Sequence, residues 1–503
     1  MKKISILSIL FAGLFLLNGC QKDYLDTKPS SSVATATLFE SFENARMLIV
    51  GTNRARFRAT DLGGNTIHQF QYGERSSTGL WDYLGDDYFA MGLQAYGMLR
   101  MHRDNLHVEN ERADVTIFPW TFLYRMIENV NQLICGIDDV KNVNAAQKAF
   151  LLGNALVYRA HYHHLIVQTY AQAIHHSPNE LGVPIMITIE GEPLPRSTVA
   201  EVYAQIEKDL KDALTALETQ GVAALTPNIT FASPRVVKGL LARFYMCKHD
   251  WDNAIKFANE ARVGVPLMTQ AQYANGFFTR NDEWMWASFV PNDEANSYAT
   301  FPAEVTNGDM YPAAWSFDNC INKHLVLSAD PDDCRFKGLV RLPRNTHGGD
   351  FDVPTRYDKY RTTLAAAYDL VYMRGAEMLL TEAEAMCMKG GQSAAVKALL
   401  KTLLTARVHA AYAGKVDAMT DAQLLEEVKW QRRIEFWGEG FRFHDLKRRG
   451  ESMDRSDNGN NQARNKVKIV TNPKSHYWVY KIPNQEVLNN PHMVQNDYDQ
   501  DWR

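Results

Sequence analysis

The sequence predicts a mainly α-helical protein in which a scaffold of helical repeats carries two large loop-rich insertions, at about residues 57–110 and 267–368. Three observations predict this class. Apolar residues recur at helical spacing in long segments throughout the chain. Two of these segments form helix pairs that share a spacing of small residues. The two insertions break the helical pattern and are rich in Gly, Asp, Asn, Pro, Tyr and Trp.

The chain begins with a short export signal. Two lysines precede an apolar run over residues 4–17. This run is shorter than the roughly 20 apolar residues of a membrane-spanning helix, so it is typical of a signal peptide. Gly19 and Cys20 then form a site that resembles the bacterial lipobox, with Asn18 as a mild departure. The resemblance implies removal of residues 1–19 and lipidation of Cys20; the alternative is an ordinary secretory peptide with a chance cysteine.

The mature chain is expected to be a mildly acidic protein without a basic stripe for nucleic acid. The full sequence has a net charge of -4, and loss of the signal removes two lysines. Residues 20–37 are polar and rich in Ser and Thr, which predicts a lipidated flexible tether. Residues 38–503 are long enough for one large or two interlocked cores, and we expect a single domain with its insertions.

Helices are expected along the first half of the chain on either side of the first insertion. The expected spans are 38–56, 111–139, 145–171 and 198–218. Four prolines between residues 178 and 195 predict an extended crossing before the last of these spans, because proline removes an amide donor and disfavours helix.

The clearest architectural pattern is the helix pair that follows. Ser233 is a good N-cap and Pro234 suits the first helical position. Leu241, Ala242 and Tyr245 on the first helix, alanines at 254 and 261 on the second, and Pro266 beyond it resemble the tetratricopeptide pattern. Small residues at such a crossing let antiparallel helices approach closely.

A second pair is expected over residues 369–407. Its first helix ends at Lys389 before two glycines, its second begins at Ser393, and alanines 383 and 395 again stand 12 apart. Thr420 opens a capping box for one more helix to about residue 437. Residues 465–503 are predicted to be a loop-rich tail.

Four motifs stand out along the chain. Residues 431–448 read QRRIEFWGEGFRFHDLKR, and residues 480–491 read YKIPNQEVLNNP. Together with residues 374–385 and 159–162, these motifs resemble the SusD/RagB family, in which the last two correspond to an R-x-A-E…AEA helix and an R-A-x-Y helix. Gln431 and Phe436 depart from the family pattern, as do His163 and His164.

The resemblance implies a lipid-anchored protein of the outer membrane that faces the cell exterior. Members cap a SusC-like TonB-dependent transporter and capture nutrient, usually oligosaccharide, for uptake. The resemblance therefore implies a glycan-binding lipoprotein with no catalytic residue and no cofactor; the same import role for peptides is an alternative. A surface glycan hydrolase and a purely structural repeat scaffold remain two further hypotheses.

Aromatic residues of the insertions are the candidate ligand site, because flat rings stack on the CH faces of sugars and polar neighbours satisfy the hydroxyl rim. The candidates are Trp81, Asp82 and Tyr83 in the first insertion and Tyr311, Trp315 and Asn319 in the second. The alternative is that these rings pack the insertions onto the scaffold. Trp284 and Trp286 are expected to belong to the core and are the next candidates.

Other polar residues are interpreted as structural. Arg432, Glu435, Glu439, Arg442 and Asp445 alternate in sign at helical spacing, which predicts ion pairs. His161 and His164 are expected to pack rather than to bind metal, and the segment beginning at Asp454 is interpreted as a turn rather than a calcium loop. Cys135, Cys247 and Cys387 are expected to be buried, and Cys320 and Cys334 could pair. No sequence motif for a metal, nucleotide or hydrolase site occurs.

Overall fold

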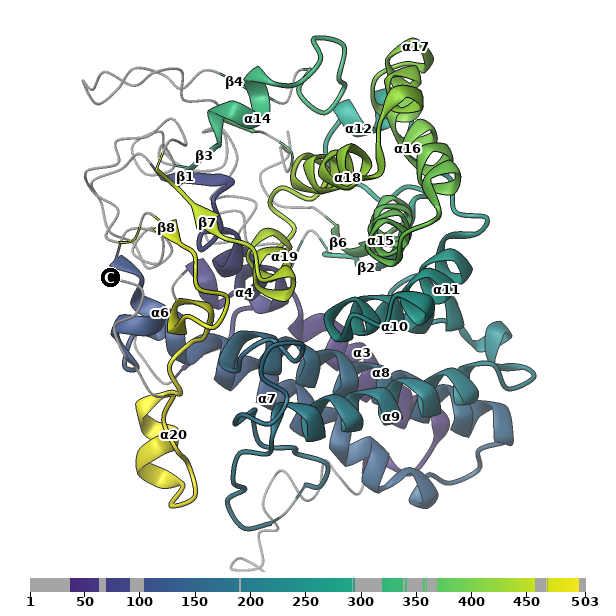
Figure 1. Ribbon diagram of the computed structural model, residues 1–503. Helices are drawn as coiled ribbons and strands as arrows, with labels where there is room; N and C mark the ends of the chain where they lie inside the picture. Colours follow the sequence, from purple (N-terminus) through teal and green to yellow (C-terminus); the bar gives the residue numbers. More distant parts are fainter. Residues whose placement is uncertain are drawn as a thin grey trace, which may run out of the picture.

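The computed structural model describes residues 37–62, 69–90, 104–189, 191–291, 293–294, 319–337, 340–341, 356–357, 359, 369–456, 467 and 469–496. Helices dominate these residues (Figure 1), so the prediction of a mainly α fold is confirmed. None of the described helices has the length and apolar character needed to cross a membrane. Cys20 and nearly all of the tether lie outside the described residues.

Four helices form the first part of the scaffold, and all four were predicted. The central helix α8 (Ala145–Tyr170) packs between α7 (Asp114–Cys135) and α9 (Val199–Leu217), and α3 (Phe42–Ala55) packs on α7 and α8. Both α8 and α9 begin with a capping box, in which the side chains and backbone amides of the N-cap and N3 residues bond reciprocally. These local contacts explain why the starts of the two helices could be read from the sequence.

The predicted helix pairs follow as a continuous array. Helix α11 (Trp251–Arg262) packs between α10 (Pro234–Lys248) and α15 (Gly375–Lys389), and α16 (Ser393–Arg407) packs on α15. Ala254 and Ala261 are fully buried, as a close crossing requires. Ala395 is exposed, so the matching alanine of the second pair does not lie at a crossing. Ser233 is the N-cap residue of α10, but its side chain makes no capping bond.

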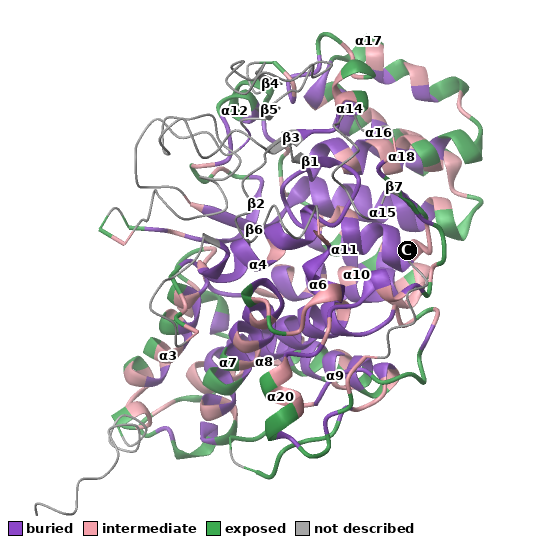
Figure 2. Ribbon diagram, turned by 90° about the vertical axis from the view of Figure 1, so that its left-hand side faces the viewer, coloured by how far each residue is buried: buried purple, intermediate pink, exposed green. Residues whose placement is uncertain are grey.

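Further helices and turns complete the helical part of the fold (Figure 1). Helix α18 (Asp421–Glu435) begins with the predicted capping box and ends two residues before the expected end. The others are short: α17 (Ala410–Ala413), α19 (Arg442–Arg449) and α20 (Asn484–Asn489), with the 3-10 turns η3 (Ile137–Asp139), η4 (Val222–Leu225), η5 (Gly414–Ala418) and η7 (His476–Trp478). Figure 2 shows that α4, α8, α10 and α15 are largely buried, whereas the outer helices have exposed faces.

Strands occur only as two-stranded pairs within the described residues. The buried pair joins β2 (Trp284–Ser288) to β6 (Leu370–Arg374), antiparallel, with Ser288 opposite Leu370. Trp284 and Trp286 are 3% and 0% exposed, which confirms their predicted place in the core. The other pairs are β1 (Tyr88–Ala90) with β3 (Asn319–Ile321), β4 (Val340–Arg341) with β5 (Arg356–Tyr357), and β7 (Met453–Asp454) with β8 (Ile469–Val470).

The sequence suggested that the first insertion consists of loops, but the structure shows helices in it. It contains α4 (Gly73–Asp82), the turn η2 (Gln69–Gln71) and α6 (Leu106–Glu109). The second insertion contains α12 (Gln270–Ala274) and α14 (Lys323–Leu327) besides its short strands.

The prediction for Cys135 is wrong, and the structure bears on the pairing of Cys320 and Cys334 that the sequence left open. Cys135 is exposed rather than buried, because it lies at the end of α7 on the face turned from the core. Cys334 is a buried free thiol, so the structure does not pair it with Cys320, whose side chain lies outside the described residues.

Candidate functional site: the junction of the two insertions

The two insertions meet at the antiparallel pair β1–β3. Tyr88 lies opposite Ile321, and Ala90 lies opposite Asn319. Because the strands run in opposite directions, the chain leaves β1 after Ala90 at the same end of the pair at which it enters β3 at Asn319. The described strand β5 lies beside β3. We call this pair the β1/β3 junction.

The C-terminal motif, residues 431–448, packs against this junction. The ring of Tyr88 stacks on Trp437, with ring centroids 4.6 Å apart and planes 6° apart. The indole N–H of Trp437 donates to the carbonyl oxygen of Asp87 over 3.1 Å, and Arg433 pairs with the Asp87 carboxylate at 2.5 Å. Stacking and charge-assisted bonds together fix the entry to β1.

A second ion pair forms at Asp86, the residue before Asp87. Arg442 Nε and Nη2 donate to the two carboxylate oxygens of Asp86 over 2.6 and 3.0 Å. Burial alone would raise the pKa of Asp86, but the Arg442 guanidinium outweighs it and the pKa falls to about 2. Asn322, just after β3, bonds the backbone carbonyls of Asp86 and Asp87, which ties the second insertion to the same support.

Trp81, Asp82 and Tyr83 do not form the exposed platform that the sequence suggested. They lie at the end of α4 and are 2%, 3% and 0% exposed. Asp82 accepts a bond from the amide N–H of Gly440 over 2.8 Å, and its burial raises its pKa to about 8. In this structure the three side chains therefore pack inside the protein instead of presenting a face to solvent.

The reason for this difference lies in two glycines. Gly73 has a φ of +69°, and a Cβ there would stand 2.1 Å from the carbonyl oxygen of Arg56, so this glycine is required where the chain enters α4. Gly440 has a φ of +84° and packs against Thr78 of α4. Gly73 thus lets the chain enter a helix, and the distant C-terminal motif covers that helix.

The other candidate residues remain predictions. Tyr311 and Trp315 lie outside the described residues, and so does the side chain of Asn319, whose backbone belongs to β3. The structure therefore brings the chain segment just after Tyr311 and Trp315 to the first insertion, but through Asn319 and β1 rather than through Trp81.

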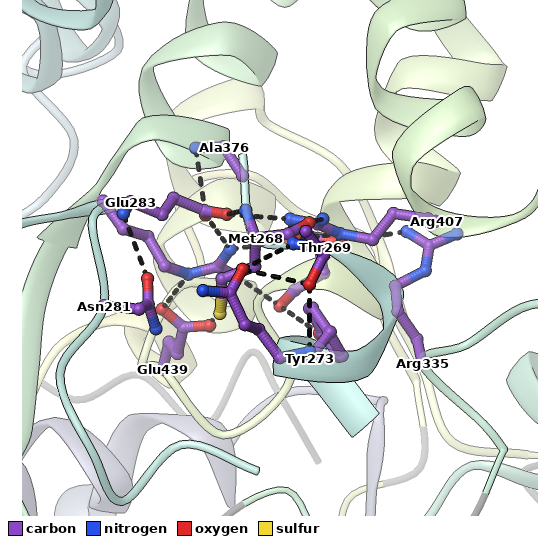
Figure 3. A network of polar contacts seen from close by, with 12 residues as sticks. Met268, Thr269, Tyr273, Asn281, Glu283, Arg335, Ala376, Arg407 and Glu439 are labelled. Carbon is purple, nitrogen blue, oxygen red and sulfur yellow. Dashed lines mark hydrogen bonds and ion pairs between the residues drawn. The ribbon is translucent and has the colours of Figure 1, made fainter. Parts of the chain in front are cut away.

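A buried group of charged side chains lies behind this support. We call it the charge cluster; it comprises Glu283, Arg335, Lys359, Arg374, Arg407, Glu435 and Glu439. Figure 3 labels four of these residues: Glu283, Arg335, Arg407 and Glu439. Arg374 lies 2.8 Å from Glu283, 2.6 Å from Glu435 and 2.8 Å from Glu439. Burial would raise the pKa of Glu439, yet Arg374 and Lys359 hold it at about 2.

These contacts confirm that the alternating charges of the C-terminal motif are ion pairs. Glu435 and Glu439 pair within the charge cluster, and Arg432 pairs with Asp445 at 2.9 Å. All are satisfied by protein partners, so they hold α15, α18 and α19 together.

The histidines and acids do not gather as a metal centre in the described residues. His161 bonds Glu74 over 2.9 Å, and His164 packs against the rings of Tyr203 and Phe244, which matches their predicted packing role. One exposed group, Asp330, Asp332 and His409, has ligand atoms within 4.8 Å of one another, but Asp332 is already paired with Lys337. Ser456 N–H donates to Asp454 Oδ1, as in the predicted turn.

The sequence interpretation missed the residues that support the junction. Asp86, Asp87 and Tyr88 received no role, and neither did Arg433 and Trp437 within the C-terminal motif. The adjacent acids before an aromatic residue were a signal, since two carboxylates in a row are buried only when paired. Their arginine partners lie about 350 residues away in sequence, and no local pattern connects them.

Two family models match different parts of the chain. A family model described as the SusD family matches residues 335–498. A second, described as starch-binding associating with outer membrane, matches residues 23–246. No match was found among curated proteins.

Solved structures resemble the whole fold. A SusD superfamily protein from Bacteroides thetaiotaomicron is 18% identical, with a TM-score of 0.78 over 91% of this chain and 100% of its own. A SusD-like carbohydrate binding protein from Bacteroides vulgatus is 22% identical, with a TM-score of 0.74 over 91% and 98%. A laminarin binding SusD-like protein is 19% identical, with a TM-score of 0.66 over 92% and 100%.

Proposed function

Because the chain belongs to the SusD family, we propose that it is a cell-surface lipoprotein that captures an oligosaccharide and delivers it to a SusC-like TonB-dependent transporter in the outer membrane. One family model is described by association with the outer membrane, and two similar structures are described as carbohydrate and laminarin binding. The lipobox-like Cys20 supplies the anchor in this proposal.

The observation that carries the proposal is the β1/β3 junction. It joins two insertions on a rigid support of stacked rings and buried ion pairs. Binding residues on loops that a rigid scaffold positions are a common arrangement for ligand recognition. Tyr311, Trp315 and Asn319 are the residues that we assign to the ligand.

We assign binding rather than catalysis to this face. The carboxylates that support the junction, Asp86 and Asp87, are both paired with arginines and buried. Arg442 lowers the pKa of Asp86 to about 2, so Asp86 is not suited to donate a proton to a leaving group, which a glycosidase acid must do. Peptide remains the second ligand class, to be tested beside glycans.

Calorimetry of the mature chain tests this proposal against soluble oligosaccharides, including laminarin fragments, and peptides. Each stacking ring contributes about 0.5–1.5 kcal/mol beyond its buried area, so Tyr311→Ala/Trp315→Ala should weaken glycan binding by roughly tenfold to a hundredfold. Trp251→Ala, which removes a half-buried ring on α11, is the matched control and should bind normally.

Unaltered affinity in the folded double variant would show that these rings do not bind the ligand. Release of shorter sugars during the titration, detected by chromatography, would instead favour the hydrolase hypothesis.

A further inference from the structure

A groove lies far from the β1/β3 junction, between α7, the connection 184–194 and α20. It encloses about 520 Å³, and we call it the α7/α20 groove. Its floor includes Trp120 and Tyr124, its walls include Met186, Ile189 and Leu194, and Asn489 lies at one end. Figures 1 and 2 both place α20 at the opposite end of the molecule from β1 and β3. This volume falls within the range of roughly 300–1,000 Å³ that small-ligand pockets span.

The walls of the groove are fixed by hydrogen bonds, so the groove is preformed. Tyr124 Oη donates to the carbonyl oxygen of Pro184 over 2.9 Å. Asn131 Nδ2 donates to the carbonyls of Met186 and Thr188 over 3.1 and 3.2 Å. Asn490 Nδ2 donates to the carbonyl of Leu194 over 2.9 Å, which ties the end of α20 to the opposite wall.

The groove lies in the main concentration of exposed apolar side chains. Of the eleven large hydrophobic residues that are exposed among the described residues, six lie on the two segments that form or flank its walls. They are Leu181, Ile187, Ile189, Leu194, Leu488 and Val494, and their exposure runs from 40% to 68%. Single exposed apolar residues are ordinary, but a cluster beside a groove marks an interaction site.

The rim of the groove is acidic. Glu128 and Glu192 are exposed and Glu486 is half-buried, and none of them forms an ion pair within the described part of the chain. Arg125, the basic residue of the lining, donates to the carbonyl oxygen of Asp61 over 3.0 Å. The rim therefore offers three carboxylates to a cationic group.

We propose that the α7/α20 groove binds a short oligopeptide that carries apolar side chains beside a lysine or an arginine. The aliphatic walls match apolar side chains, and the unpaired carboxylates match the basic residue. A sugar fits less well, because it has neither the apolar side chains nor the positive charge that these features match. The face of Trp120 is also unavailable for stacking: the residue is 5% exposed and its ring lies between Tyr124 and Tyr170. This proposal does not depend on the glycan function.

The test is enrichment of peptides by the immobilised mature chain from a tryptic digest of casein, read by mass spectrometry. Trypsin cleaves after lysine and arginine, so its peptides end in a basic residue. A digest of the same protein by a protease that cleaves after acidic residues is the comparison with opposite charge. Ile189→Lys/Leu194→Lys removes the apolar walls, and Glu128→Lys/Glu192→Lys reverses the rim; both pairs are surface positions that should not disturb folding. Met47→Lys/Val263→Lys, at residues 61% and 58% exposed elsewhere, is the matched control.

Wild type and the control should enrich apolar, basic peptides, and each groove variant should reduce that enrichment at least tenfold. The strongest peptide, synthesised and titrated by calorimetry, should repeat this order, and oligosaccharide binding should be unchanged in both groove variants. Equal enrichment by wild type and groove variants would overturn the proposal, as would preference for the acidic digest. Self-association of wild type that the groove variants abolish would assign the groove to a second copy of the chain instead.

Discussion

Three buried histidines, His107, His163 and His164, lie in the core without charge. Desolvation lowers the pKa of each to about 3, because a protonated imidazole at these positions would lose its water. His107 bonds the carbonyl of Tyr477 and His163 bonds the carbonyl of Arg159, so both have neutral-form partners. In the unfolded chain the same side chains titrate near pH 6.5.

We therefore expect the protein to lose stability as the pH falls below about 6.5. Between pH 6.5 and about 3 these histidines are protonated in the unfolded chain but neutral in the folded chain. Each histidine therefore lowers the free energy of unfolding by up to about 1.4 kcal/mol per pH unit of acidification. The stabilisation is complete above pH 6.5 and is lost on acidification. The melting temperature measured from pH 7.5 to 4.5 checks this.

His164→Leu is the variant that isolates the effect. The Nε2 atom of His164 has no hydrogen-bond partner, so the substitution should flatten the dependence of melting temperature on pH without leaving a polar group unpaired. His409→Asn removes a histidine that is half exposed and should leave the slope unchanged. A slope for His164→Leu that parallels wild type would contradict the explanation.

At the scale of elements, the charge cluster adds buried ion pairs to helices α15, α16 and α18, which already share an apolar core. Glu435 at the end of α18 lies 2.6 Å from Arg374, 2.8 Å from Arg407 and 3.3 Å from Arg335. Glu435→Gln would leave three buried guanidinium groups with one carboxylate fewer. Because an uncompensated buried charge costs about 3–5 kcal/mol, we expect a loss of that size in the free energy of unfolding by denaturant.

Glu426→Gln on the same helix is its control. Glu426 is 71% exposed and pairs with Lys429 at the surface, where such pairs contribute about 0–1 kcal/mol. Equal effects of the two substitutions would mean that the charge cluster does not stabilise the fold.

The helix crossing of α10 and α11 gives a second test at this scale. Ala254 is fully buried where α11 packs against its neighbours, so Ala254→Leu should force extra volume into a close contact and cost about 1–3 kcal/mol. Ala395→Leu makes the same change at an exposed position on α16 and should alter the melting temperature little. Similar melting temperatures for both variants would count against a close crossing at Ala254.

The sequence predicted those helices whose signals are local, and it failed where burial depends on distant residues. Helices α8 and α9 were predicted from apolar spacing and α18 from the capping box at Thr420, and both signals are local. Helix α4 was missed, because its burial depends on Gly440 and other residues more than 300 positions away. The candidate Trp81 failed for the same reason: an aromatic residue looks alike in sequence whether a loop exposes it or a distant segment covers it.

At the scale of the whole molecule, the helical array is a frame with different chemistry at its two ends. In Figure 1, β1 and β3 lie in the upper half of the molecule, and α20, whose residues line the groove, lies in its lower part. In our proposal, attachment to a membrane depends on Cys20. Each buried CH₂ of a lipid chain contributes about 0.8 kcal/mol, and several chains together hold firmly.

Cys20→Ala should therefore release the protein from membranes. The polar leader that follows Cys20 provides no other hold. Fractionation of cells that express the variant should find it in the soluble fraction, and Cys135→Ala, at an exposed cysteine of the folded domain, should stay with the membranes. Membrane retention of Cys20→Ala would contradict the lipid anchor.

Partnership with a transporter is the last expectation at this scale. A scaffold of stacked helix pairs presents an extended surface, and a ligand captured at one face must be passed on if it is to serve uptake. We expect the protein to co-purify in detergent with a large outer-membrane barrel, as a dimer of such pairs, and the complex to survive the groove substitution Ile189→Lys/Leu194→Lys. Native mass spectrometry of the complex, with and without oligosaccharide, measures both the partner and the stoichiometry. Recovery of this chain alone from native membranes would leave a binding protein without delivery and would remove the transporter from the proposed function.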